Sequence, residues 1–544
     1  MINNFWLYFN TIRFLSFRQI YFRIINIFLI KRLNYAVSPI IRNFTSSLIV
    51  IDRKKHIFTA PNNIKIHQKD FIINSNFDWC KNSYTKLDIY NLHYLDFLSE
   101  YEESNAQFFE NMIICWIDSN KNIREHGWDP YPTSLRLVNL VKWHLKSKCK
   151  NKKILNSIYL QARWLNQNIE YHISGNHVIA NAKALLFSGL LFNNKESFKW
   201  YLKGLNLFTR SLNIQINDDG GHYERSPMYH SIITEDILDV LNIISASGNI
   251  VEVKVLNVLK KKLIDCISYY SYLCHPDDLP AFFGDTNYDS SLSKSYLQEY
   301  IFLMYPKWNL EKAKNTFCTE LNKSGYCCVK NKNIYLISDI GDTRDLDQPG
   351  HTHAALLSYE VSLFNHRFIV NSGISTYSEN KQREYERSTK AHNTVEIDLK
   401  NSQEVWKSFR LGRRARVFDK EINNNNKNSR VSIKHNGYSK FIKDKNIIHK
   451  RTWEVNENEF VVTDEIIGNY ENAISRIYFH PDIEIIKKNT LKMPNGKMIT
   501  FQVYDNNYSI INSMWYPRFN LALENRLLEI KLCNNYSKVR FILN

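Results

Sequence analysis

The chain has 544 residues, of which 44% are hydrophobic and 14% are aromatic, and its formal net charge is +17. This length predicts two or three domains, and the composition excludes an intrinsically disordered protein. The charge predicts attraction to polyanions, although a Lys-, Asn- and Ile-rich composition explains it equally well. An acidic polysaccharide is a better candidate partner than nucleic acid, since no DNA- or RNA-binding motif accompanies the charge. Nine scattered cysteines, an odd number, argue against a full disulfide framework and against a zinc finger.

The first 35 residues mix large apolar side chains with basic ones, namely Arg13, Arg18, Arg23, Lys31 and Arg32. No apolar run reaches the roughly 18 residues that span a bilayer, and the order of residues is not that of a signal peptide. Two interpretations are open: a helix packed on the body of the protein, or a basic amphipathic helix in peripheral contact with an anionic membrane. We predict a cytoplasmic protein, with the periplasm as the alternative.

The period of the apolar residues changes along the chain. Between about residues 75 and 315 it is near 3.6, which predicts helices at 131–145, 154–171, 174–192, 196–215, 226–247 and 251–273. After about residue 325 it is two, which predicts antiparallel strands at 334–340, 356–364, 367–370, 460–467 and 476–479. Asn365 and His366 are expected in a hairpin turn, and the Asn-rich run 423–428 in a loop or hairpin tip. The predicted divisions are a basic and apolar segment at 1–75, a helical domain at 76–320 and a β domain at 325–544.

The most informative motif is D-D-G-G-H-Y-E-R-S-P-M-Y, residues 218–229. Ser226 is a good N-cap and Pro227 suits the first helical position, so Tyr229 is expected in the first turn of a helix. Unpaired N–H groups and the helix dipole favour negative charge there and would stabilise a phenolate. A half-buried tyrosine that only caps the helix is the alternative interpretation.

A second motif, S-G-N-H at 174–177, predicts another helix start. Ser174 can cap this helix and leaves Asn176 and His177 in its first turn. Two polar side chains are therefore expected at the end of a second helix.

Two further motifs are rich in histidine. In G-H-T-H at 350–353, His351 and His353 have the spacing of two that would put both on the same side of a strand. Y-E-R-S-T-K-A-H-N-T-V at 385–395 holds Arg387, His392 and Asn393. Four polar clusters in one chain favour a functional site over a set of structural histidines.

Together these motifs resemble the heparinase II/III family of polysaccharide lyases. The resemblance is carried by G-N-H, D-G-G-H-Y-E-R-S-P-M-Y, P-G-H-T-H and R-S-T-K-A-H-N-T-V, and it extends to N-L-H-Y-L-D at 91–96, G-W-D-P-Y-P-T-S-L-R at 127–136 and the stretch at 402–415. It covers about residues 85 to 420. It implies an α+β multidomain fold, in which an N-terminal incomplete (α/α) toroid is followed by a C-terminal antiparallel β-sandwich.

In this family the reaction is β-elimination next to a uronic acid, in which the C5 proton is removed and the bond to O4 breaks. Hydrogen-bond donors aimed at the developing enolate lower the barrier, and Asn176 is the candidate donor, assisted by His177. Tyr229 suits the roles of base and acid if a nearby cation, Arg225 or Arg387, lowers its pKa from about 10.

If the C5 proton and O4 lie on opposite faces of the sugar, a second group must face Tyr229. The candidates are three histidines of the same motifs, His177, His351 and His353. Substrate binding, by stacking on a pyranose or by pairing with a carboxylate, is assigned to Trp128, Tyr131, Arg136, His222, Tyr223, Glu224, Arg225 and Asn393. The first three of these residues are equally consistent with a role in capping helices at the toroid entrance.

No cofactor is required for this reaction, but the resemblance allows a divalent metal in the β domain. His353 and His392 would bind it, with a third ligand near residue 371. Relatives commonly have Asp there, whereas this chain has Asn371, a poorer ligand. Ala355 also stands where an acidic or amide residue is frequent.

The leading interpretation is a lyase that cleaves an acidic glycan containing uronic acid, such as a capsule, an exopolysaccharide or a glycosaminoglycan-like polymer. A uronyl C5-epimerase is the first alternative, because it forms the same carbanion and returns the proton to the opposite face. The second alternative is a non-catalytic glycan-binding protein of polysaccharide biosynthesis or export.

Overall fold

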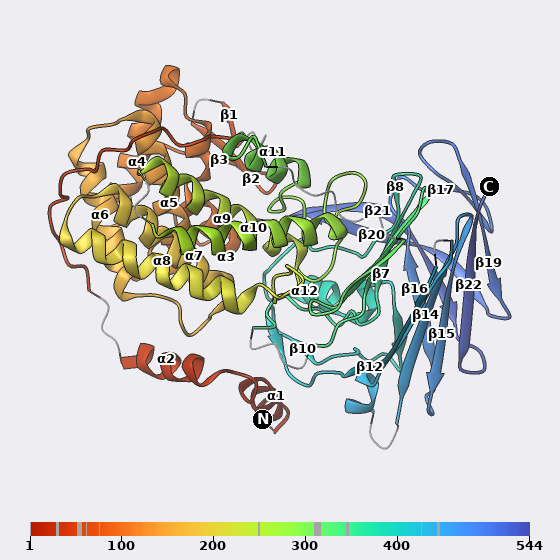
Figure 1. Ribbon diagram of the computed structural model, residues 1–544. Coiled ribbons are helices and arrows are strands. Elements are labelled where there is room, and N and C mark those ends of the chain that lie inside the picture. The colour runs from red at the N-terminus through yellow and green to blue at the C-terminus, as the bar shows by residue number, and fades with distance from the viewer. Residues whose placement is uncertain are drawn as a thin grey trace.

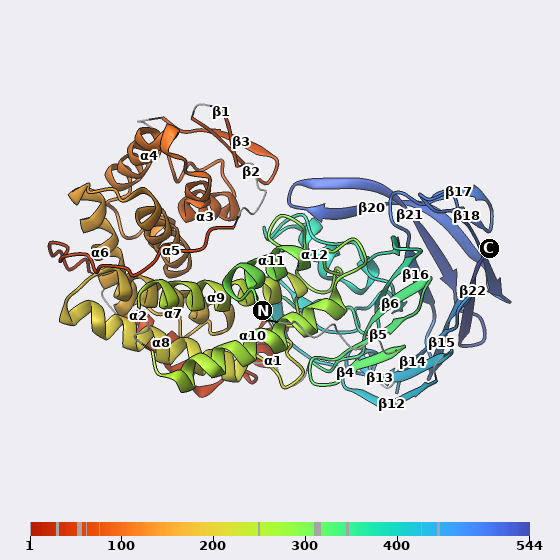
Figure 2. The same cartoon turned by 45° about the horizontal axis from the view of Figure 1, so that its top comes forward.

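The computed structural model describes residues 2–28, 32–51, 57–60, 62–74, 77–248, 251–308, 317–343, 348–425, 427–442 and 446–544. Helices make up most of the N-terminal part, and antiparallel sheets make up most of the C-terminal part (Figures 1 and 2). The predicted fold class, an incomplete (α/α) toroid followed by an antiparallel β-sandwich, is confirmed.

The toroid is built from helices of nine to 21 residues. They are α3 (Lys86–Tyr94), α4 (Ala106–Ser119), α5 (Pro130–Ser147), α6 (Lys152–Gln167), α7 (Gly175–Leu191), α8 (Lys195–Gln215), α9 (Pro227–Ala246), α10 (Val253–Leu273) and α11 (Lys294–Met304). All six predicted helices are present. The helix predicted at 154–171 ends earlier, at Gln167, because Asn168 leaves the helical conformation.

Helices α7 and α9 lie at the centre of the toroid. Almost every residue of both is buried, which is typical of helices that other elements cover on all sides. Buried ion pairs connect them, because Lys183 Nζ lies 2.7 Å from Asp236 Oδ1 and also binds Asp239. The first turns of these two helices carry the motifs at 174–177 and 226–229.

Two helices and a small sheet precede the toroid. They are α1 (Ile2–Ile12), α2 (Phe17–Phe28), β1 (Phe58–Ala60), β2 (Asn63–Ile66) and β3 (Lys69–Ile72). Figure 1 places α1 and α2 along the lower side of the molecule and β1 to β3 on the upper side. Across the described ranges, every helix is too short or too polar to cross a bilayer.

The β part consists mainly of three antiparallel sheets, of orders β4-β5-β6-β7-β8, β12-β13-β14-β15-β22-β19-β18-β17 and β20-β21-β16-β9; β10 and β11 form a separate pair. The bounds are β4 (Cys318–Leu321), β5 (Tyr326–Lys330), β6 (Ile334–Asp339), β7 (Tyr359–Leu363), β8 (His366–Ile369), α12 (Lys381–Arg387), β9 (Val395–Ile397), β10 (Val405–Trp406), β11 (Arg410–Leu411), β12 (Val417–Asn424), β13 (Ser429–His435), β14 (Ile448–Val455), β15 (Glu459–Ile467), β16 (Ala473–Tyr478), β17 (Glu484–Lys487), β18 (Thr490–Lys492), β19 (Met498–Tyr504), β20 (Tyr508–Arg518), β21 (Leu521–Lys531) and β22 (Tyr536–Leu543).

The five-stranded sheet is buried on both faces, and this joins the two parts of the molecule. Along β5, Tyr326 and Cys328 pack in one apolar cluster with Tyr269 of α10. The alternate residues Cys327 and Val329 pack in a second cluster with the larger sheets. Because side chains alternate between the faces of a strand, one sheet contacts the toroid and the sandwich at the same time.

Two predicted turns can be compared with the structure. The hairpin between β7 and β8 turns at Phe364 and Asn365, whose φ angles are 51° and 68°, so its predicted position at Asn365 and His366 is wrong by one residue. Two positive φ angles characterise the turn that matches the strand twist. The Asn-rich run lies at a hairpin between β12 and β13, as predicted, but its first two residues, Asn423 and Asn424, are the last paired residues of β12.

Candidate active site

The first turns of α7 and α9 are held in different ways. Ser226 caps α9 as predicted, because its Oγ accepts a hydrogen bond from the Tyr229 N–H at 3.3 Å. Ser174 lies at the start of α7, but its side chain makes no cap, so that prediction is wrong. The carboxylate of Glu224 takes this place: it accepts the Asn176 backbone N–H at 3.0 Å and the Asn176 Nδ2–H at 2.8 Å. Glu224 therefore joins the two predicted motifs.

Gly175 is required for this contact. Its φ is +60°, and a Cβ at this position would lie 1.9 Å from Glu224 Oε1. We expect Gly175→Ala to lower the free energy of unfolding by about 1 to 3 kcal/mol. Urea denaturation would measure the loss. Gly496→Ala is the matched control, because Gly496 has φ +82° and open space around it. Equal losses in both variants would contradict a tight contact with Glu224.

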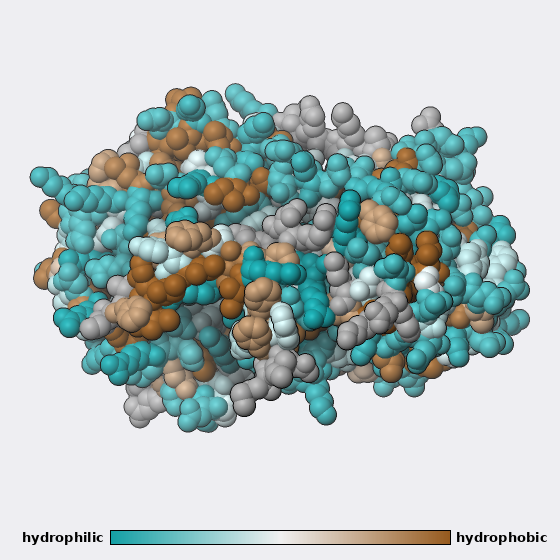
Figure 3. All heavy atoms as spheres, turned by 90° about the horizontal axis from the view of Figure 1, so that it is seen from below, coloured by the Kyte–Doolittle hydropathy of each residue, from teal (hydrophilic) through white to brown (hydrophobic). Residues whose placement is uncertain are grey.

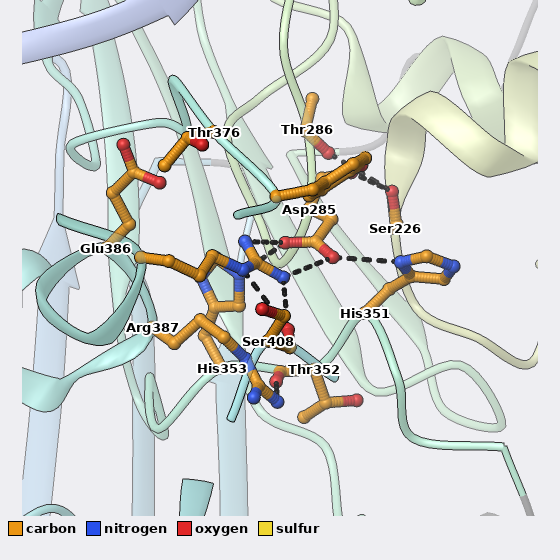
Figure 4. Close-up of polar contacts among 12 residues, drawn as sticks. Ser226, Asp285, Thr286, His351, Thr352, His353, Thr376, Glu386, Arg387 and Ser408 are labelled. Carbon is orange, nitrogen blue, oxygen red and sulfur yellow. Dashed lines mark hydrogen bonds and ion pairs between the residues drawn. The ribbon is translucent and has the colours of Figure 1, made fainter. Parts of the chain in front are cut away.

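A buried carboxylate, Asp285, holds three side chains of the β part (Figure 4). Arg383 binds it with two hydrogen bonds of 2.6 and 2.8 Å. His351 Nδ1 lies 2.9 Å from Asp285 Oδ2, and His353 Nε2 lies 2.8 Å from Oδ1. The histidines lie in a loop and not on the predicted strand, but both face one carboxylate. We call Asp285, Arg383, His351 and His353 the Asp285 cluster.

The Asp285 cluster has defined charges. Although burial opposes ionisation, Arg383 and the two histidines hold the pKa of Asp285 well below its ordinary value. Burial lowers the pKa of His353 to about 4, despite the opposing effect of Asp285. His353 is therefore neutral at pH 7, and the carboxylate is balanced by the Arg383 guanidinium. Bidentate pairing and ring N–H groups fix the geometry of this cluster.

Tyr229 packs directly on the Asp285 cluster. Its ring stacks on that of His351 with centroids 3.8 Å apart and an interplanar angle of 23°. Its hydroxyl lies 3.3 Å from the hydroxyl of Tyr377, a residue of the loop before α12. A phenol and an imidazole oriented by a carboxylate are thus adjacent, which is a suitable arrangement for proton transfer.

The predicted lowering of the Tyr229 pKa is wrong. Burial raises the pKa of Tyr229 well above 10, and the neighbouring Tyr377 and Tyr131 hydroxyls add to this effect. The two cations that were expected to lower it are engaged elsewhere. Arg225 pairs with Asp339, and Arg387 donates to backbone carbonyls. Tyr229 therefore carries its proton in the free protein.

His177 packs on Tyr131, a residue that lines the cavity described below. Its Nδ1 is 3.1 Å from Glu170 Oε2, and its ring lies 4.4 Å from the ring of Tyr131. Burial opposes protonation of His177, but the Glu170 carboxylate outweighs it and raises the pKa of His177 above its ordinary value. In its protonated form, His177 can pair with a substrate carboxylate.

A cavity of about 620 Å³ lies between the toroid and the β part. Both parts contribute to its wall: Tyr131 and Tyr229 from the toroid helices, Tyr377 and Phe519 from the β part, and Lys65 from β2. The volume is within the range of small-molecule sites. Of the predicted substrate-binding residues, Tyr131 therefore lies where a sugar could contact it.

A metal does not fit the side chains that were predicted to bind it. Both ring nitrogens of His353 are in use, because Nδ1 lies 3.1 Å from His392 Nε2 and the other nitrogen faces Asp285. Asn371 Oδ1 accepts the Asn393 backbone N–H at 3.0 Å. Within the described ranges no group of three or more His, Cys, Asp or Glu is arranged to hold a metal ion. No step of the chemistry below is therefore assigned to a metal.

Two predicted substrate-binding residues belong to the core of the toroid. The Trp128 Nε1–H donates to the Asn120 carbonyl, and Trp128 is 4% exposed. Arg136 is fully buried and donates to Gln161 Oε1 and to the His93 carbonyl. The substrate-binding assignment of Trp128 and Arg136 is therefore corrected to a structural one. The sequence alone does not show whether an aromatic or cationic side chain of a helix faces the core or the solvent.

Other predicted residues also hold the fold together. His222 is buried against Gln215, Arg225 donates to the Ser324 carbonyl at 3.1 Å, and Asn393 donates to the Tyr359 carbonyl at 2.9 Å. Their assignment to substrate binding is corrected in the same way. Tyr223 is half-buried, and its ring packs edge-on against His222.

Arg387 and His392 lie next to the Asp285 cluster and bind backbone carbonyls around it. Arg387 donates to the Lys407 carbonyl at 2.8 Å and to the Thr352 carbonyl at 3.0 Å, and burial lowers its pKa to about 9. His392 Nδ1 lies 2.7 Å from the Ser388 carbonyl, and burial lowers the pKa of His392 to about 3. Arg387 and His392 therefore position the loop that carries His353.

Sequence reasoning missed four residues of this site: Glu170, Asp285, Arg383 and Tyr377. Asp285 follows Gly284 in a short polar turn, and Gly284 has a φ of +55° and a position where a Cβ would lie 2.5 Å from the His351 carbonyl oxygen. A Gly-Asp pair directly after the apolar run 281–283 was the available signal. Arg383 and Tyr377 had no comparable signal.

Comparison with known proteins identifies the family. Residues 84–311 match the family model described as Heparinase II/III N-terminus, and residues 314–536 match the one described as Heparinase II/III-like, C-terminal. The two matches together cover most of the chain, which belongs to the heparinase II/III family of polysaccharide lyase-like proteins.

Individual relatives are distant. The heparin-sulfate lyase of Bacteroides stercoris is 24% identical over 345 residues, which are 58% of this chain and 47% of that protein. The heparin-sulfate lyase of Bacteroides thetaiotaomicron is 22% identical over 429 residues, which are 67% of this chain and 57% of that protein. The matched part thus spans about half the length of these curated relatives.

Solved structures share the fold. The crystal structure of heparinase III has a TM-score of 0.69 at 18% identity and covers 88% of this chain and 80% of its own. A mutant of a heparan sulfate lyase from Pedobacter heparinus has a TM-score of 0.61 at 17% identity and covers 91% of this chain and 84% of its own. At these identities the likeness concerns the fold alone.

Proposed function

We propose that the protein is a polysaccharide lyase that cleaves an acidic glycan containing uronic acid by β-elimination. One observation carries the proposal: Tyr229 lines a cavity between the two parts of the molecule and stacks on His351, which Asp285 orients. The curated relatives named heparin-sulfate lyases support the same class of reaction. We propose a cytoplasmic protein, as predicted from its sequence.

The proton transfers are divided between Tyr229 and His351. If the His351 Nδ1–H donates to Asp285, His351 Nε2, which lies 3.7 Å from Glu224 Oε2, can accept the C5 proton. The C5–H electron pair then forms the C4–C5 double bond, and the C4–O4 bond breaks. Tyr229 is protonated because of its raised pKa, so its hydroxyl can give a proton to O4. The Tyr377 hydroxyl, 3.3 Å away, can donate to the phenolate as it forms.

The charge of the carbanion is opposed by the uronate carboxylate and must be offset. His177 is the group for this role, because Glu170 raises its pKa and the ring lies against Tyr131 at the cavity wall. Asn176 can assist with the second N–H of its amide, since the first is donated to Glu224. Fixed donors of this kind need no reorganisation when the charge develops.

This role predicts a change in pH dependence. His177 is cationic below its pKa, so kcat/KM is expected to fall as the pH rises through that raised pKa. Glu170→Gln removes the charge that raises the pKa, and the alkaline limb should move to lower pH. Steady-state rates over a pH series measure the limb. In His177→Gln it should disappear, and profiles that stay the same in both variants would contradict the role of His177.

The charges that line the cavity indicate which kind of acidic glycan can bind there. Among the described residues that line it, six are Asp or Glu and four are Lys or Arg. The positive charge of the whole chain is therefore not concentrated at this wall. A dense array of sulfates would be repelled there, whereas single uronate carboxylates can be matched by His177. We infer that a polyuronate with few sulfates, such as a capsular polysaccharide or an exopolysaccharide, is preferred over a highly sulfated one.

The proposal is tested by incubating the purified protein with heparosan, alginate, heparin and native capsular glycans. An increase in ultraviolet absorbance from the unsaturated product supports a lyase, and heparosan should react faster than heparin. Deuterium from solvent at C5 without cleavage would make the protein a C5-epimerase instead. Binding without exchange or cleavage would make it a glycan-binding protein.

A further inference from the structure

Helices α1 and α2 are packed with their polar side chains inward. Asn10, Thr11 and Gln19 are buried at 6%, 8% and 1% exposure. Ten large apolar or aromatic side chains of the same two helices are exposed: Phe5, Trp6, Tyr8, Phe9, Ile12, Phe17, Tyr21, Ile24, Ile27 and Phe28. We call these ten residues the outward face. An apolar surface of this extent is unusual on a soluble monomer and indicates an interaction site.

The outward face follows the helical repeat. Phe17, Tyr21, Ile24 and Phe28 recur at intervals of four, three and four residues, so they form one stripe along α2. Phe17 is 83% exposed and Phe28 is 79% exposed. In Figure 3, which shows the molecule from below, hydrophobic side chains gather on the side where these helices lie.

Polar and aromatic contacts hold the helices in this orientation. The Gln19 Nε2–H donates to the Ile173 carbonyl at 3.1 Å, and Asn26 Nδ2 lies 3.0 Å from His172 Nδ1. Trp406 Nε1–H donates to Thr11 Oγ1 at 3.1 Å. The ring of Phe22 also packs on Tyr171, and that of Tyr8 packs edge-on against Trp406. Both helices are therefore attached to the body through polar residues and these two rings, and the stripe along α2 faces outward.

The charge of the segment identifies the kind of partner. Residues 1–51 contain no Asp or Glu, and Arg13, Arg18 and Arg32 are exposed. A symmetric contact with a second copy would bring these arginines towards each other without a carboxylate between them. An anionic surface would pair with them. Helices that expose aromatic residues next to arginine are typical of the membrane interface.

We propose that the outward face docks on a membrane containing anionic lipids, with α1 and α2 lying in the plane of the interface. The cavity is lined partly by residues of β2, which Figure 1 places on the side opposite to α1 and α2. Docking therefore leaves the cavity open to solution. Membrane binding and cleavage of a soluble glycan are separate properties of the two sides.

The test uses the full chain in a flotation assay with two kinds of vesicle, phosphatidylcholine alone and phosphatidylcholine mixed with phosphatidylglycerol. We expect binding to the anionic vesicles and weaker binding in high salt. Phe17→Ser/Phe28→Ser should weaken binding about tenfold or more, because two rings no longer enter the interface. Arg13→Gln/Arg32→Gln should reduce the preference for anionic lipid.

The matched control is Val253→Ser/Leu399→Ser, which removes two apolar side chains of 71% and 77% exposure elsewhere on the surface. It should bind vesicles like the original chain, and all variants should cleave a soluble glycan at the original rate. Absence of binding to anionic vesicles would overturn the proposal. A dimer in light scattering that Phe17→Ser/Phe28→Ser dissociates would assign the outward face to a second copy instead.

Discussion

Tyr229→Phe is expected to lower kcat by roughly 10²- to 10⁴-fold while KM changes little. The change removes the hydroxyl that donates to O4 and keeps the ring that stacks on His351 at 3.8 Å. Because the volume is almost unchanged, the protein should fold and bind substrate as before. Initial rates of product absorbance, measured over a range of substrate concentrations, separate the two kinetic constants.

Tyr288→Phe is the matched control for this variant. Tyr288 lines the same cavity but is not part of the stack on His351. Its loss of a hydroxyl should change kcat far less. If Tyr229→Phe kept near-normal turnover, the proton to O4 would have to come from another group, with Tyr377 the nearest hydroxyl.

Asp285→Asn is expected to lower the free energy of unfolding by about 3 to 5 kcal/mol and to abolish turnover. It leaves the buried Arg383 guanidinium without the carboxylate that binds it, and one amide oxygen replaces the two carboxylate oxygens that face Arg383, His351 and His353. Urea denaturation measures the stability, and rates measured well below the unfolding midpoint report on the folded protein.

Asp464→Asn separates the two effects. Asp464 is a buried carboxylate in the sandwich that binds Arg451 at 2.7 and 2.9 Å and His449 at 2.8 Å, so its surroundings are like those of Asp285. The Asp464 variant should lose a similar amount of stability and keep its turnover per folded molecule. Equal loss of turnover in both variants would show that Asp285 acts through stability alone.

Much of the fold could be predicted because its signals are local. Ser226, Pro227 and the apolar repeat after them mark the start of α9 within a few residues of chain, and the structure confirms this helix. The change to a period of two similarly predicted strands such as β6 and β15. The turn after β7 was misplaced because Asn365 follows Phe364, and an aromatic residue with positive φ is rare.

The site was harder to predict because its contacts are not local. Asp285 binds Arg383, which lies 98 residues further along the chain. A contact between residues so far apart cannot be predicted from their spacing in the sequence. The pKa of Tyr229 was predicted wrongly for the same reason. Its position in a first turn suggested a phenolate, but burial, a property of the tertiary structure, outweighs the helix dipole. Motif residues such as Trp128 could not be divided into core and surface for the same reason.

The position of Asp285 constrains how this chain can be divided or recombined. Asp285 falls in the part that matches the N-terminal family model, at 84–311, whereas His351, His353 and Arg383 fall in the part that matches the C-terminal one, at 314–536. A cut between the two leaves an anion without its guanidinium on one piece and a buried arginine without its carboxylate on the other. A chimaera of this chain with a distant relative will therefore fold only if one half supplies the carboxylate and the other half supplies the arginine and histidines that bind it. We expect these two halves to be inherited together.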